Sequence, residues 1–161
     1  MRFSVLRQVG RAIFALASIG ALSLGLTACT STVSLQAAPA SNDPGCAAIS
    51  VRLPDDVDGN AKRATDAQAT AAWGSPARII LRCGLPEVKA STLICTTIGG
   101  VDWLVDPSKE PSYRFITFGR NPATEVIVDY KHASGVSTIE ALSQAVAAGP
   151  KADVRCLNPK S

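Results

Sequence analysis

The sequence predicts an α+β fold, in which a small antiparallel β-sheet is packed by N- and C-terminal helices and braced by two disulfides. Strand-like segments follow one another through the middle of the chain, and helix signals stand on both sides of them. No alternation of strand and helix patterns favours a parallel sheet. The disulfides follow from the cysteine count described below.

The N-terminal helix is expected to begin after Asp43, because an aspartate can cap a helix and Pro44 at the first helical position loses no needed hydrogen bond. Ile49 and Leu53 would share its inner face. The DDVDGN segment (55–60) is expected to be a loop with a solvated Asp–Gly turn. An EF-hand calcium loop is not expected there, since its first and last positions would lack ligands.

Apolar and alternating segments predict six strands in the middle of the chain. In the segment ARIILRC, Cys83 and two aliphatic residues would occupy one face, with Arg78 and Arg82 on the other. Gly99-Gly100 is a two-residue hairpin signal, and residues 106–112 are expected to be a loop. The expected strands span residues 69–73, 77–83, 93–98, 101–105, 113–118 and 125–130.

The C-terminal helix is expected to begin at Ser137, because Ser137 and Glu140 match a capping box. Leu142 and Val146 would lie on its apolar face. Gly149, followed by proline, would end it.

The N-terminus has the pattern of an export signal. The segment MRFSVLRQVGR contains three arginines and no acid, and residues 12–26 are uncharged and mostly apolar. A transmembrane helix needs about 20 apolar residues, and Thr27 ends this run early. We therefore expect residues 1–28 to be a cleaved signal peptide.

The tetrapeptide Leu26-Thr27-Ala28-Cys29 resembles the lipobox of bacterial lipoproteins. The resemblance implies cleavage before Cys29 and attachment of a diacylglyceryl group, with acyl chains such as palmitate, to its sulfur. Two acyl chains give durable membrane anchoring. Residues 29–43, rich in Ser, Thr, Ala and Pro, would then form a flexible tether, followed by one globular domain over residues 44–158.

The charge balance gives no support for nucleic-acid binding, and we expect no nucleic-acid partner. The full chain has 16 Lys+Arg against 13 Asp+Glu, and the signal holds three arginines and no acid. The remainder therefore has no net charge, and it contains no basic stripe with interleaved aromatic residues.

Four cysteines remain once Cys29 is assigned to lipid, and in an exported chain an even number indicates disulfides. Their spacing does not match a metal site. Three pairings are possible. We expect Cys83–Cys95, which would close a local loop, and Cys46–Cys156, which would join the two ends of the domain.

Two tryptophans are the most informative aromatic residues. Trp73 and Trp103 are expected in the core because of the apolar area they bury, and the alternative is a platform for a sugar ring. Asp102, beside Trp103, and Arg120 predict an ion pair that braces two loops. The functional alternative is a ligand pocket in which Arg120 binds an anionic group and Trp103 forms a wall.

Catalytic signals are weak. Asp102, Asp106, Glu125 and Asp129 lie on or beside expected strands, and paired carboxylates are the machinery of glycosidases. Acids on the outer, solvated face of a sheet are the favoured explanation. His132 is the only imidazole and has no nucleophile motif near it. We expect no cofactor and no metal.

Four motifs resemble a known family, in this order: AWGSP (72–76), LRCG (81–84), GVDWL (100–104) and FGRNPA (118–123). They are similar to the domain-of-unknown-function 3515 family of short exported actinobacterial proteins, over about residues 46–146. The resemblance implies a cell-envelope context and the cysteine framework. It implies no activity, since the family has none assigned.

We therefore expect an uncharacterised lipid-anchored protein on the outer face of the cytoplasmic membrane, acting as a non-catalytic binding or accessory module for an envelope partner. The alternative is a cell-wall carbohydrate-binding module or hydrolase with a pocket around Asp102, Trp103 and Arg120. For localisation, the alternative is a secreted or signal-anchored protein.

Overall fold

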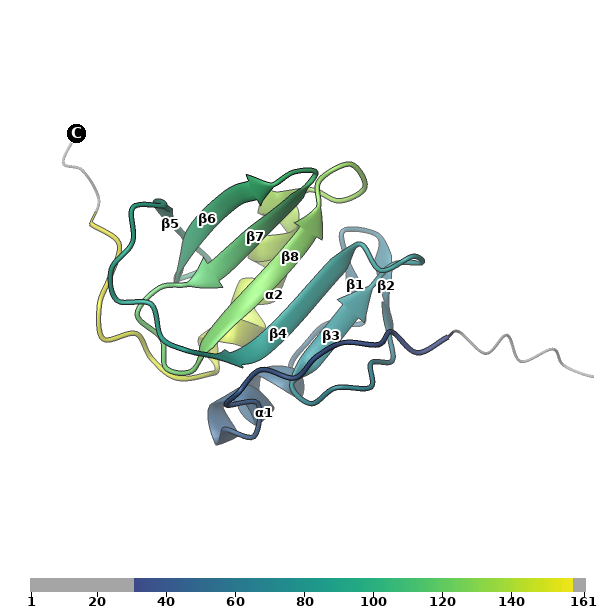
Figure 1. The fold of residues 1–161 in the computed structure, drawn as a ribbon, viewed down its shortest axis with the longest axis horizontal. Helices are drawn as coiled ribbons and strands as arrows, with labels where there is room; N and C mark the ends of the chain where they lie inside the picture. Colours follow the sequence, from purple (N-terminus) through teal and green to yellow (C-terminus); the bar gives the residue numbers. More distant parts are fainter. Residues whose placement is uncertain (1–30, 158–161) are drawn as a thin grey trace, which may run out of the picture.

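The computed structural model describes residues 31–157, which form an eight-stranded antiparallel sheet with two helices (Figure 1). The strand order is β1-β2-β3-β4-β8-β7-β6-β5, so the last strand inserts between β4 and β7. The elements are α1 (Pro44–Ser50), β1 (Asp56–Val57), β2 (Asn60–Arg63), β3 (Thr70–Trp73), β4 (Ile79–Leu85), β5 (Ile94–Ile98), β6 (Val101–Lys109), β7 (Ser112–Thr117), β8 (Ala123–Asp129) and α2 (Gly135–Ala147).

The sheet is larger than the sequence predicts. The segment expected as a loop forms the β1–β2 hairpin, and its turn has positive φ at both Asp58 (51°) and Gly59 (73°). Asp56 stabilises this turn by accepting a hydrogen bond from the Gly59 amide. Likewise β6 continues to Lys109, although a loop was expected over residues 106–112.

One face of the sheet, here called the inner face, packs against α2, which lies behind the sheet in Figure 1. Trp73 and Trp103 are fully buried on this face, as expected for core residues. Their indole N–H groups donate to the Pro54 carbonyl (3.0 Å) and to the Ser143 hydroxyl of α2 (3.1 Å). Both polar edges are therefore satisfied within the core.

The two helices cover the sheet unequally. Asp43 caps α1 as expected, but α1 packs chiefly against α2, so the expectation of two helices on the sheet holds for α2 alone. The cap of α2 is Ser134 rather than Ser137. The Ser134 amide also donates to the Asp58 carboxylate (2.7 Å), which joins the β1–β2 turn to the start of α2.

Segments without regular structure cover much of the opposite, outer face. The expected flexible tether is wrong for the part that the structure describes, because this segment packs along the sheet in front of β3 and β4 (Figure 1). Val33 forms a bridge with Thr65, and Ala38 is buried. The Ala40 amide donates to the Gly84 carbonyl (2.9 Å).

Glycine at position 84 permits this close approach. Its φ is 110°, and a Cβ there would lie 2.5 Å from the backbone nitrogen of Ser41. At the other end of the segment, the Asp66 carboxylate accepts a hydrogen bond from the Leu35 amide (2.8 Å), which lowers the pKa of Asp66. Backbone contacts thus hold both ends of the segment on the domain.

The disulfides join Cys46 to Cys83 and Cys95 to Cys156, so the expected pairing is wrong. Cys83 lies on β4 and Cys95 on β5, and three strands separate them. At about 4.8 Å per strand, four strand spacings put these cysteines about 19 Å apart, too far for a disulfide. The first bond ties α1 to the inner face, and the second ties the C-terminal segment to β5.

Peptide mapping without reduction is expected to recover the Cys46–Cys83 and Cys95–Cys156 peptides. Changing both Cys95 and Cys156 to alanine is expected to lower the free energy of unfolding by about 4 kcal/mol, because the bond closes a loop of 61 residues. Chemical unfolding of this variant and of the oxidised wild type measures the difference. Recovery of a Cys83–Cys95 peptide would contradict the strand order.

Candidate functional site

Charged side chains of alternating sign cross the middle of the outer face. Arg82 on β4 stands opposite Glu125 on β8, and Arg114 on β7 stands opposite Asp106 on β6. Arg114 is diagonal to Glu125, because its direct partner on β8 is Ile127. Neighbouring strands thus present positive, negative, positive and negative groups in turn, and we call these four residues the charge ladder.

Glu125 is the buried centre of the ladder, with 2% of its side chain exposed. Arg82 directs two N–H groups at Oε1 (2.6 and 2.5 Å), and the Nε–H of Arg114 donates to Oε2 (2.5 Å). The arginines are 33% and 37% exposed. Both carboxylate oxygens are therefore engaged, while each guanidinium also reaches solvent.

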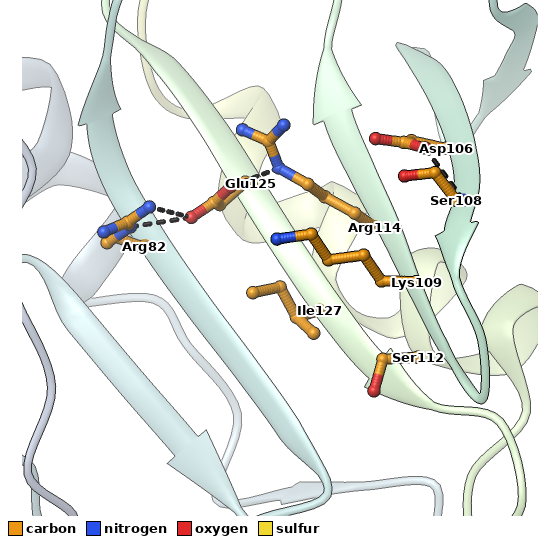
Figure 2. A pocket seen from close by; sticks show the side chains of 8 residues that line it. All are labelled: Arg82, Asp106, Ser108, Lys109, Ser112, Arg114, Glu125 and Ile127. Carbon is orange, nitrogen blue, oxygen red and sulfur yellow. Dashed lines mark hydrogen bonds and ion pairs between the residues drawn. The ribbon is translucent and has the colours of Figure 1, made fainter.

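An open groove lies over the ladder (Figure 2). It consists of two adjoining hollows of about 230 and 460 Å³, which share Arg82, Glu125 and Ile127. Figure 2 shows the side chains of Lys109 and Arg114 extending from β6 and β7 toward Glu125. The first hollow is lined by Arg82, Asp106, Ser108, Lys109, Ser112, Arg114, Glu125 and Ile127; the second by Ser34, Leu35, Gln36, Ile80, Arg82, Glu125 and Ile127.

The acid at the far end of the ladder is held by the irregular end of its own strand, where the register of β6 shifts between Asp106 and Lys109. Asp106 accepts a hydrogen bond from the Ser108 amide (3.0 Å). Hydrogen bonds from the Ser108 hydroxyl and amide lower the pKa of Asp106, and the charges of Arg114 and Lys109 lower it further. Asp106 is therefore ionised at neutral pH, and its carboxylate is bound by Ser108 on the same strand.

The pocket predicted around Trp73, Asp102, Trp103 and Arg120 does not form. The tryptophans have no exposed surface and cannot offer a wall to a ligand. Asp102 lies on the outer face, since the neighbouring Trp103 points inward.

The expected ion pair between Asp102 and Arg120 is also wrong. Asp102 accepts hydrogen bonds from the Thr97 hydroxyl (2.6 Å) and the Cys156 amide (3.0 Å). Arg120 donates to the Pro150 and Val146 carbonyls, and its burial lowers the pKa of its guanidinium. Both residues therefore hold the C-terminal part of the chain rather than each other.

The four candidate carboxylates are divided among three places. Asp106 and Glu125 meet at the groove, and Asp102 lies under the C-terminal segment. Asp129 accepts from His132 (2.6 Å), a hydrogen bond that lowers the pKa of Asp129. Within residues 31–157, no cluster of three or more His, Cys, Asp or Glu side chains could hold a metal ion.

Sequence reasoning missed Arg114 and Lys109. A signal was present, since an acid in the middle of the strand ATEVIVD and a lone base in SYRFIT each need a partner when the strands are buried. The pairing itself depends on the register of β7 and β8, which the sequence does not specify.

Cys29 and the expected signal peptide lie outside the described residues. Among the residues that the structure does describe, no helix is long and apolar enough to cross a membrane.

A family model with the description "Protein of unknown function (DUF3515)" matches residues 11–154. The chain belongs to the DUF3515 family. This confirms the resemblance seen in the four sequence motifs, and the DUF3515 match contains the whole charge ladder. Searches of the curated proteins and of the solved structures found no match.

Replacing Glu125 with glutamine is expected to lower the free energy of unfolding by about 1–3 kcal/mol, because hydrogen bonds to a buried charged acceptor are weakened and two cations remain together. Solvent at the partly exposed arginines keeps the loss below that of a fully buried charge. Urea unfolding at pH 7 measures it. Glu140→Gln, on the exposed face of α2, is the control, and equal midpoints for both variants would contradict the role of the ladder.

Proposed function

We propose that this DUF3515 protein is an exported, lipid-anchored envelope protein that works as a non-catalytic binding module, with the outer-face groove as its binding site. One observation supports the site above all: the groove lies open over a buried, fully hydrogen-bonded charge centre. Concave sites with a few fixed polar groups are typical of ligand binding.

The packing of the N-terminal segment supports a position close to the membrane. Ser31 is the second residue after Cys29 and already contacts the domain, since Arg63 donates to its carbonyl and hydroxyl. Two extended residues span about 7 Å. A lipid on Cys29 would therefore hold the β2 side of the domain near the headgroups, with no long tether between them.

The chemistry of the groove favours binding over catalysis. A glycosidase needs one carboxylate as nucleophile or base and another as proton donor. Both oxygens of Glu125 accept hydrogen bonds from guanidinium groups, and Asp106 is held ionised by hydrogen bonds from Ser108 on the same strand. The pair is better suited to fixing cationic side chains than to moving a proton.

The proposal is tested by expressing the full chain in a bacterial host, as wild type and as Cys29→Ser, with a radiolabelled palmitate supply. The wild type is expected to be labelled and recovered with membranes, and the variant to lose the label and leave the membrane fraction. Equal labelling of both would contradict the anchor.

A photo-crosslinking residue at Ser112, in the groove, tests the binding role in the same cells. Intact-mass analysis is expected to find an adduct there and none with the same residue at Val136, on the exposed face of α2. The same adducts at both positions would contradict the assignment of the groove.

A further inference from the structure

We propose that the groove recognises an oxyanion, a phosphate or carboxylate group on a ligand with an apolar body, through Arg114, Lys109 and Arg82. The inference rests on the proposed function, because it names the ligand class of the same groove. The inference adds to the proposed function an assignment of the residues that bind the charged group and of those that contact the remainder of the ligand.

The first argument is the balance of charge. Three cationic side chains and two carboxylates line the first hollow, but the carboxylates are already engaged. Glu125 is bound on both oxygens through the Nε–H of each arginine and one further group of Arg82. Among the described residues, no hydrogen bond or ion pair engages the Lys109 ammonium or the terminal amino groups of Arg114. The groove thus retains cationic donors that make no hydrogen bond or ion pair within residues 31–157, and its three cations exceed its two carboxylates by one charge.

The second argument is orientation. Glu125 fixes the Nε side of Arg114, so the two terminal amino groups point away from Glu125, as Figure 2 shows. A guanidinium held on one side presents a planar pair of donors that matches phosphate and carboxylate oxygens. The buried acid therefore acts as a positioning group, since it lowers the rotamer entropy that binding would otherwise cost.

The third argument concerns the body of the ligand. Ile127 lines both hollows, and the second adds Ile80 and Leu35 beside the charged centre. Ser108 and Ser112 add hydroxyl groups at the other end. An oxyanion at Arg114 would thus have polar donors on one side and three aliphatic side chains among polar ones on the other, which suits an anionic group attached to an apolar chain.

Four probes separate the contributions: inorganic phosphate, octyl phosphate, octanoate and uncharged 1-octanol. They are titrated into the ¹⁵N-labelled full-length mature protein, purified without lipid as Cys29→Ser and with both disulfides formed. The charged amphiphiles are expected to shift the signals of Lys109, Ser112 and the Arg114 Nε–H. Octanol is expected to bind at least about fivefold more weakly, because it lacks the charge.

The source of the oxyanion follows from two of these probes. Octyl phosphate binding more tightly than inorganic phosphate is expected and points to a lipid or another amphiphile. If the two bind equally, the ligand is a soluble phosphate, and the inference that the ligand has an apolar body is wrong. Octanol binding as tightly as octyl phosphate would overturn charge recognition altogether.

Lys109→Gln is the decisive variant. No hydrogen bond or ion pair joins Lys109 to Glu125, so the substitution leaves the contacts of the buried acid in place. It is expected to weaken octyl phosphate binding about fivefold, with unchanged unfolding, while Lys151→Gln, at an exposed position outside the groove, leaves binding unchanged. Equal affinities for the Lys109 variant and the wild type would overturn the inference. Failure of all anions, together with a crosslink at Ser112 in cells, would reject the oxyanion and leave the binding module standing.

Discussion

The structure depends on one constraint: α2 covers the inner face of the sheet, and the outer face has to be covered without a helix. The N-terminal segment shields Leu85, Ile116 and Ala123 on that face. The C-terminal segment, fixed by Cys95–Cys156 and by Asp102, covers the side near β5 and β6. These segments leave the groove open, and its position is therefore a consequence of how the sheet is covered.

An isolated charge at the floor of the groove would be unfavourable, because it would lose its water without gaining a partner. The charge ladder avoids this by placing charges of opposite sign on neighbouring strands. Glu125 loses nearly all its water, which is tolerable only because three N–H groups replace it. The same contacts hold Arg82 and Arg114 at the rim of the groove. Stability and binding are thus linked, since Glu125 neutralises part of the charge of the two arginines and also orients their guanidinium groups toward the groove.

The parts of the fold that depend on local pattern were predictable from the sequence. The alternation in ARIILRC places β4, and the apolar area of Trp73 and Trp103 places both in the core. The parts that depend on strand order were not. Insertion of β8 between β4 and β7 separates Cys83 from Cys95 and brings Glu125 to Arg82 and Arg114. Asp102 and Arg120 each lie within one of the four motifs, but both bond a C-terminal segment whose path no local pattern specifies.

The most direct test of the charge ladder is the ¹⁵N spectrum of the arginine Nε–H groups at neutral pH. The structure predicts two Nε–H signals, from Arg82 and Arg114, that exchange slowly with water and that shift in Glu125→Gln. Arg52, whose side chain bonds only a backbone carbonyl at the surface, serves as the reference. If all three exchange at the same rate and Glu125→Gln changes none of them, the ladder does not exist in solution and the groove has no fixed charge centre.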